Sequence, residues 1–475
     1  VAVGRNALDN NTTAANNVAI GSLCMHDNTT GASNVAIGMS TLSNNTTAAN
    51  NVAIGFESLK TNTTGANNTA LGYQAMLDST TATQNVAIGK QAFQNGTTGS
   101  YCTAIGVQAL QAVVTGDNNV AVGRKAMYDN TSGADNTAVG NAALGNNTTG
   151  DNNTAVGMNA LVANTTASNN TAVGKSALIT NTTGHSNTSL GRQSMYWNTT
   201  GYDNTAIGMD AAQSNTDGHS NVSAGVSALF ANLGGSYNTA IGKFALKANT
   251  SADANTALGY NALFANTTGS SNTALGVNCM DANTTGASNT AVGVDTLNQN
   301  TTGIQNVSVG ESSLSTNTTG SYNTALGRTS LLSNTTGTHL SAVGRSALQN
   351  NTTGSNNTGI GFDAGYTTTT GNYNVSIGFN SKATSATASG QFTLGDSNIS
   401  NLRCNDTSIS SLSDSRDKTD VIDSPYGLDF INTVRPVQFL WDTRDGNAKD
   451  GTTRIGFLAQ ELLAATNGNN AVLDL

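Results

Sequence analysis

The chain contains few charges, few aromatic side chains and almost no proline. Of its 475 residues only 10% are charged and 5% are aromatic, and there are 2 prolines and 4 cysteines. A net charge of −9 argues against the basic surface that nucleic-acid binding requires. No apolar run approaches the length of a membrane-spanning helix. We therefore expect neither nucleic-acid binding nor membrane insertion.

The residue types that most often bind metals or perform catalysis are scattered along the chain and do not form clusters. Cys24 and Cys279 occupy equivalent repeat positions too far apart to pair, so we expect small buried side chains at both. The glycines lack the strand–loop–helix context of a nucleotide site. We expect no cofactor, no metal and no activity on an external substrate. The histidines are isolated from one another: His26, His185, His219 and His339.

Glycine, by contrast, is abundant and strictly periodic. From Gly4 to Gly395 a glycine closes a short apolar run at every seventeenth residue, which makes 24 repeats without an insertion or deletion. A globular enzyme has no reason to keep such a period, whereas a solenoid needs it because each coil lies in register on the next. The repeats predict an all-β solenoid, a parallel β-roll with 17-residue coils.

The repeat consensus is N-T-A-(V/I/L)-G-x-x-A-L-x-x-N-T-T-G-x-x, and we number positions from the first glycine. Position −1 is Val, Ile or Leu except at Ala224, and position +4 is Leu, Met or Phe from Leu8 to Leu348 except at Ala212. We assign both positions to the core. Alternation before the glycine predicts a short strand with Ala on one face and branched residues on the other. The A-L pair predicts a second short strand, and N-T-T-G predicts a turn.

Asparagine stands at position −4 of almost every repeat, as at Asn17, Asn34 and Asn51. We expect these side chains to form a ladder in which each amide bonds the amide of the next coil. The N-x-T triplets also match glycosylation acceptors, but turn geometry is sufficient to explain them. Both prolines, Pro425 and Pro436, lie outside the repeats, as expected where every amide donor is needed.

Each coil has only two or three modest apolar side chains to bury. We expect the columns of Ala to let a second backbone approach, so that chains associate around a common axis. At about 4.8 Å per coil, 24 coils would form a rod of roughly 115 Å. Position +1 mixes cations such as Arg124 and Lys175 with aromatics such as Tyr73. We interpret it as a solvated edge rather than a ligand-binding stripe.

The repeat units N-T-A-V-G-x-x-A-L-x-x-N-T-T-G resemble the head repeats of trimeric bacterial adhesins, which form a left-handed parallel β-roll. They are even more similar to repeats of phage and bacterial tail-fibre proteins. The resemblance covers residues 1–395 and implies an architecture more than a function.

After Gly395 the period stops. Residues 396–412 are rich in Ser and Asn and predict a linker, and residues 413–475 predict a small α+β module. Ser424-Pro425 is a helix-start signal for a helix through residue 431. Residues 437–441 and 454–457 predict two strands, and residues 458–465 a further helix.

The module resembles the S74 peptidase family, the C-terminal intramolecular chaperones of phage tail fibres and tailspikes. Four blocks carry the resemblance in order: residues 413–418 (SDSRDK), 427–431 (GLDFI), 435–441 (RPVQFLW) and 455–461 (IGFLAQE). The resemblance implies trimer assembly followed by single-turnover autoproteolysis. It makes Ser413 the nucleophile and Lys418 its general base, since a lysine whose pKa is lowered by burial can activate a hydroxyl. Asp417 departs from the apolar residue usual in the family.

These resemblances imply a homotrimeric virion tail fibre that binds a host cell-surface receptor, either glycan or protein, and contacts other virion tail or baseplate proteins. A bacterial cell-surface trimeric adhesin with the same roll is the alternative. An ice-binding solenoid is a third hypothesis, weakened because adjacent Thr side chains diverge. Val1 opens inside a repeat and family members continue beyond the A-Q-E-L helix, so we expect missing segments at both ends.

Overall fold

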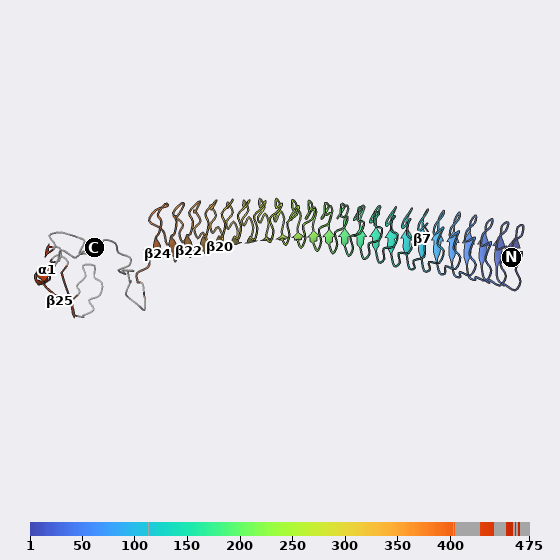
Figure 1. Ribbon diagram of the computed structural model, residues 1–475, viewed down its shortest axis with the longest axis horizontal. Helices are drawn as coiled ribbons and strands as arrows, with labels where there is room; N and C mark the ends of the chain where they lie inside the picture. Colours follow the sequence, from blue (N-terminus) through green and yellow to red (C-terminus); the bar gives the residue numbers. More distant parts are fainter. Residues whose placement is uncertain are drawn as a thin grey trace. The chain divides into compact units, whose positions relative to one another are not determined.

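The computed structural model describes residues 1–112, 114–401, 403, 428–440, 453–458, 461 and 464–465. The chain divides into two compact units, Val1–Ser400 and Asn401–Leu475. In Figure 1 the first unit is a regular stack of similar coils in which the strands line up one above another. The prediction of a parallel β-solenoid with 17-residue coils is confirmed.

Each coil contributes one short strand to a single parallel sheet, and each strand pairs with the strands of the coils before and after it. Partners lie 17 residues apart, as in Thr154↔Thr171. All but the first occupy positions −3 to −1, as the alternation predicted. The strands are β1 Ala2–Val3, β2 Val18–Ile20, β3 Val35–Ile37, β4 Val52–Ile54, β5 Thr69–Leu71, β6 Val86–Ile88, β7 Thr103–Ile105, β8 Val120–Val122, β9 Thr137–Val139, β10 Thr154–Val156, β11 Thr171–Val173, β12 Thr188–Leu190, β13 Thr205–Ile207, β14 Val222–Ala224, β15 Thr239–Ile241, β16 Thr256–Leu258, β17 Thr273–Leu275, β18 Thr290–Val292, β19 Val307–Val309, β20 Thr324–Leu326, β21 Ser341–Val343, β22 Thr358–Ile360, β23 Val375–Ile377 and β24 Phe392–Leu394.

The second strand predicted at the A-L pair is wrong. Positions +1 to +6 form a turn in the described coils, and the backbone is left-handed at +2 and +4, for example φ 57° at Asn159 and 50° at Leu161. Few side chains other than Asn adopt this conformation readily. The turn is held by the neighbouring coils, because the Leu161 amide donates to the Ala177 carbonyl at 3.0 Å. Hydrogen bonds along the stack thus offset the local strain.

The core lies between the sheet and this turn. Ala at −2, such as Ala155 and Ala172, is fully buried, as are Leu161 and Leu178 at +4. Ala is small because the other layer already fills the space: a methyl added at Gly359, in the Ala column, would meet Leu348 Cγ at 2.8 Å. The prediction that Ala columns face a second chain is wrong, since they are covered by their own chain. Assigning −1 to the core is also wrong, because that position faces outward and is half-buried or exposed.

The periodic glycines are required by the distance between coils. Gly157 has φ 137°, a conformation that side chains rarely adopt. A Cβ there would lie 2.5 Å from the Gly174 carbonyl oxygen of the next coil. Because this oxygen belongs to the backbone, it cannot move away by a side-chain rotation. The same contact recurs along the stack, which explains why the period tolerates no other residue.

Two columns of buried asparagine run along the solenoid, and only one forms the amide ladder expected. At −4 the side-chain oxygen of Asn153 accepts the backbone N–H of Asn170 at 3.0 Å, while the Asn170 amide donates to the Gly184 carbonyl. The predicted amide–amide pairing at −4 is therefore wrong as the main interaction. It occurs instead at +7, the Asn of N-T-T-G, where Asn164 donates to the Asn147 side chain at 2.9 Å. These N-T-T asparagines are buried and so are closed to glycosylation in the folded coil.

The +7 ladder lapses over three coils, where the sequence has Ser79, Gly96 and Val113. Phe93 causes the lapse at its centre. It is the one Phe in the +4 column, and its ring occupies the space that a Cβ of Gly96 would need. An aromatic ring thus replaces the asparagine side chain in the interior. The coils around residues 93–129 consequently depart from the regular repeat.

In the second unit the described residues form helix α1, Leu428–Thr433, and an antiparallel hairpin of β25, Val437–Leu440, and β26, Thr453–Gly456. The predicted helix and both strands are confirmed in type, with ends that differ by a residue or more. Glu461, Ala464 and Ala465 have helical backbone, as expected for residues 458–465. The helix-start signal Ser424-Pro425 lies outside the described residues.

Candidate functional sites

The outward face of the sheet carries a stripe of exposed apolar side chains, which we call the outer stripe. It consists of the apolar side chains at −1 and +1, with mostly Thr or Val beside them at −3 and a cation at +1 in several coils. The side chains at −3 and −1 point away from the core because neighbouring strand residues alternate. Leu258 and Leu275 are 42% exposed. Exposed apolar stripes of this length mark interaction surfaces. Exposed members at −1 and +1 include Ile20, Ile37, Met39, Leu71, Tyr73, Val107, Met158, Leu190, Ile207, Met209, Ile241, Tyr260, Val277, Val294, Val309, Leu326, Val343, Ile360, Phe362 and Phe379.

Position +1 forms one edge of the outer stripe, where cations lie over aromatic rings. The Lys90 ammonium lies 5.8 Å from the Tyr73 ring centroid, and the Arg345 guanidinium lies 5.4 Å from that of Phe362. Phe362 in turn stacks on Phe379 at 5.4 Å. Contacts between successive coils thus place cations over aromatic faces. The column is solvent-exposed, with Tyr73 46% and Phe379 59% exposed, which agrees with the solvated edge predicted from the sequence.

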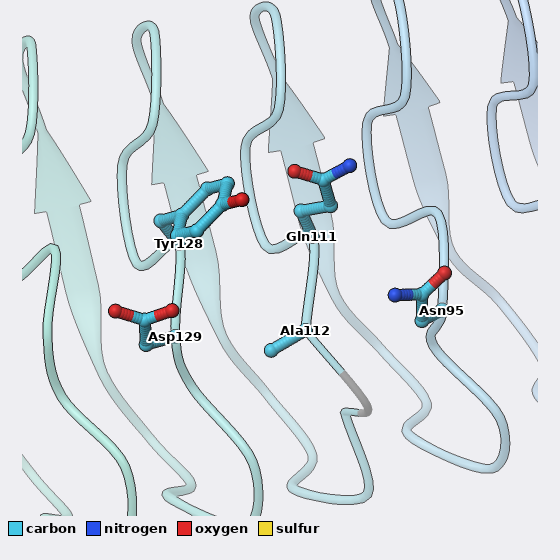
Figure 2. Close-up of a pocket in the computed structure, with 5 residues that line it drawn as sticks. All are labelled: Asn95, Gln111, Ala112, Tyr128 and Asp129. Carbon is cyan, nitrogen blue, oxygen red and sulfur yellow. The ribbon is translucent and has the colours of Figure 1, made fainter.

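A notch of about 210 Å³ opens on the opposite layer, lined by Asn95, Gln111, Ala112, Tyr128 and Asp129. Figure 2 shows these residues on the stretch of chain that runs in front of the strands. All five are half-buried. Nothing in the repeat consensus signalled this site, because it depends on which side chains neighbour one another at +5 and +6 across three coils.

The cysteines confirm the expectation of buried, unpaired side chains where the structure describes them. Cys24, Cys102 and Cys279 are buried and free. Burial raises the pKa of the Cys24 and Cys102 thiols to about 11. A thiol with so high a pKa is almost wholly protonated at neutral pH and is a poor nucleophile. Cys404 lies outside the described residues.

In the second unit Arg435 pairs with Glu461 across 26 residues of sequence. The Arg435 Nη2 atom donates to Glu461 Oε1 at 2.6 Å, which brings the strand-bearing segment and the last helical segment together. Both side chains belong to blocks that the sequence analysis singled out. Ser413 and Lys418 lie outside the described residues, so their assignment as nucleophile and base stays a prediction.

Residues 413–473 match the family model of peptidase S74, the chaperone of endosialidase. The match covers both the SDSRDK block that opens the module and the Arg435–Glu461 pair. No curated protein matches the chain significantly. The family match at the C-terminus and the solenoid of stacked 17-residue coils together fit a protein of the phage tail-fibre type.

Among the helices that the structure describes, none has the length and apolar character needed to cross a membrane.

Proposed function

We propose that this chain forms the shaft of a homotrimeric virion tail fibre that attaches to the host surface, and that its C-terminal module is a self-cleaving assembly chaperone. The observation that carries the proposal is the S74 match at residues 413–473 directly after a 24-coil solenoid. The partners would be two further copies of the chain, a receptor on the host cell and other proteins of the virion tail or baseplate.

The outer stripe supports association between copies. Each coil leaves branched residues of the sheet uncovered, and they repeat with the coil spacing of the stack. A surface that repeats in this way is matched along its whole length by another solenoid of the same period. Parallel copies around one axis bury the stripe of every chain. The number of copies, three, is taken from the family resemblance.

The repeats also explain why such a fibre needs a chaperone. Shifting one chain by 17 residues places almost every stripe residue against an equivalent one, so the shaft alone discriminates weakly between registers. A terminal domain with a unique sequence aligns the three chains before the coils associate. Cleavage afterwards releases the chaperone and makes assembly irreversible. The family resemblance assigns the cleavage to Ser413 and Lys418, with Lys418 removing the hydroxyl proton of Ser413.

Lysine in the outer stripe should abolish the trimer without unfolding the coil. Leu258→Lys combined with Leu275→Lys places two ammonium groups where assembly would bury them, which is costly because nothing pairs them. In one chain both side chains are exposed, so the coil is expected to fold. Measured with Ser413→Ala in the background, so that each 48.1 kDa chain stays uncleaved, light scattering should give about three times that mass when the stripe is unaltered. The double variant should give the mass of one chain.

The matched control for the stripe is Thr268→Lys, an exposed position at the T-T turn away from the sheet. It should leave the trimer intact. A monomeric unaltered chain, or a double variant that remains trimeric, would contradict assembly through the outer stripe.

Ser413→Ala should abolish self-cleavage of the module in the full-length protein. The unaltered chain should give two bands on a denaturing gel, and the variant one, because alanine has no hydroxyl to attack the peptide bond. Ser415→Ala, two residues away, should still cleave. Identical migration of the unaltered chain and Ser413→Ala would show that this serine is not the nucleophile.

A further inference from the structure

The notch lies where Ala112 stands at position +6 between two coils that carry longer side chains there. At position +6 the successive coils carry Asp78, Asn95, Ala112, Asp129 and Asn146. Ala112 therefore leaves open the space that a longer side chain fills in the coils on either side. In Figure 2 it lies between Asn95 and Asp129. The cavity of about 210 Å³ depends as well on Gln111 and Tyr128 beside it at position +5. Alanine alone does not define it, because alanine also stands at +6 at Ala163, Ala231, Ala248, Ala265 and Ala282.

Position +5 supplies the second wall, where a short chain of hydrogen-bonded glutamines ends that begins with Gln74 at position +2. The Gln94 amide donates to Gln74 Oε1 at 3.4 Å, and the Gln111 amide donates to Gln94 Oε1 at 2.5 Å. The next residue of the column is Tyr128, and among the described residues Gln111 Oε1 has no hydrogen-bond donor. Figure 2 shows this oxygen directed toward Tyr128. A buried acceptor without a partner is costly, and a ligand hydroxyl would relieve that cost.

The chemistry of the walls selects the ligand. Asn95 both donates and accepts hydrogen bonds, while Asp129 and Gln111 Oε1 accept them. The hydroxyls of a sugar ring donate and accept at once, so they match this set. Among the described residues no cationic side chain lines the notch, and Asp129 would repel a phosphate, a sulfate or an acidic sugar. The nearby Lys125 ammonium is held over the Tyr128 ring at 4.8 Å.

We propose that the notch is a binding subsite for one neutral sugar ring of a host surface glycan. Asn95 and Asp129 would bind hydroxyls on two sides of the ring. Gln111 Oε1 would accept a third hydroxyl once the Gln111 or Tyr128 side chain rotates to admit it. The subsite lies on the layer opposite the outer stripe, so it stays open when chains associate through that stripe. This inference rests on the proposed attachment function, and it names the receptor chemistry.

Filling the notch tests the proposal, because the repeat itself supplies the replacement. Ala112→Asn introduces the side chain that Asn95 carries in the preceding coil, so the fold is expected to persist. Ala163→Asn makes the same change at +6 in another coil, where Val162 and Ile179 stand in place of Gln111 and Tyr128. Circular dichroism of both variants should match that of the unaltered chain.

Saturation-transfer NMR on the whole chain should use D-glucose, D-galactose, D-mannose, N-acetylglucosamine and N-acetylneuraminic acid. We expect at least one neutral sugar to bind the unaltered chain and Ala163→Asn, and the signal to fall about tenfold or more in Ala112→Asn because the added side chain occupies the site. Binding of the acidic sugar alone, binding of no sugar, or equal binding by Ala112→Asn would overturn the subsite.

The adsorption of fibres to host cells tests the notch separately from the proposed attachment function. If fibres of Ala112→Asn adsorb to the host cells as well as unaltered fibres do, attachment stands and the notch is not the receptor site. If unaltered fibres adsorb to no host while the sugar still binds, the subsite stands and the attachment function is wrong.

Discussion

Gly157→Ala is expected to break the solenoid locally. The φ of 137° costs an alanine about 1–3 kcal/mol. Its Cβ would also lie 2.5 Å from the Gly174 carbonyl oxygen, a backbone atom fixed by the next coil. We expect a total loss of about 3 kcal/mol or more in local stability. Amide hydrogen exchange should rise over the coils that flank Gly157, because stability in a solenoid is a sum of neighbouring contacts.

The matched control is Gly150→Ala, at position +10 of the preceding repeat. The φ there is ordinary, although the added methyl would lie 2.2 Å from the Ala167 carbonyl oxygen. Alanine already occupies +10 at Ala48, Ala82 and Ala167, so the coil accommodates such a contact where φ is ordinary. The effect should be much smaller. Equal exchange in the two variants would show that the positive φ of the periodic glycines does not maintain the 17-residue period.

Asn164→Asp is the second change expected to have a large effect, although the two side chains have nearly the same shape. Asn164 is fully buried, and its amide donates to the Asn147 side chain and to the Ala167 carbonyl, both at 2.9 Å. Its oxygen accepts from Asn181 at 3.1 Å. A carboxylate would direct an oxygen at two acceptors and leave a buried charge without compensation. We expect a loss of about 3–5 kcal/mol at neutral pH.

The loss should depend on pH in a defined direction. Burial beside two acceptors raises the pKa of the introduced carboxyl in the folded chain above its unfolded value of about 3.9. The folded state then binds more protons than the unfolded state, so stability falls as pH rises between the two pKa values. Below that window the protonated carboxyl restores one donor. Thermal unfolding measured from acidic to neutral pH should show the variant approaching the unaltered chain as pH decreases.

Asn159→Asp provides the comparison at a half-buried position. It is at +2, where the chain already carries Asp210, Asp295 and Asp363 with the same left-handed backbone. Its stability should change little with pH or with the substitution. An Asn164→Asp variant as stable as Asn159→Asp at neutral pH would mean that the +7 ladder contributes little to the stack.

The hydroxyls of the Thr-Thr turns bear on the ice-binding hypothesis. At +8 the Thr148 hydroxyl donates to the Thr165 carbonyl of the next coil at 3.0 Å, and the Thr165 backbone N–H donates in turn to the Thr182 carbonyl one coil further on. The pattern repeats through much of the stack, as at Thr29, Thr199 and Thr284. These hydroxyls therefore hold successive coils together. A thermal-hysteresis measurement remains the direct test of ice binding.

The sequence predicts the secondary-structure types of the C-terminal module but not its side-chain contacts. Helix α1 and the β25–β26 hairpin follow from the apolar runs around Phe430, Val437 and Ile455. The ion pair between Arg435 and Glu461 was not predicted, since nothing local links two residues so far apart in sequence. The roles of Ser413 and Lys418 rest on the family resemblance and await the cleavage experiment.

The sequence by itself determined the coil length, the position of the strand before each glycine and the alternation of Ala with branched residues. Each of these follows from a periodicity that local backbone geometry must obey. It did not determine which face of the strand is buried, because alternation distinguishes an Ala face from a branched face but does not show which of them faces the core. That depended on Leu161 and its equivalents, whose left-handed backbone turns them under the sheet and leaves room only for Ala.

The tertiary structure alone also decided the partners of the buried asparagines and the existence of the notch. Asn153 and Asn164 are chemically identical, yet one bonds the backbone of the next coil and the other an amide side chain, because one precedes the strand and the other lies in the N-T-T-G turn. The notch likewise required Asn95, Ala112 and Asp129 to be stacked side by side. Contacts between residues 17 or more apart are set by the three-dimensional stack, and no local pattern in the sequence encodes them.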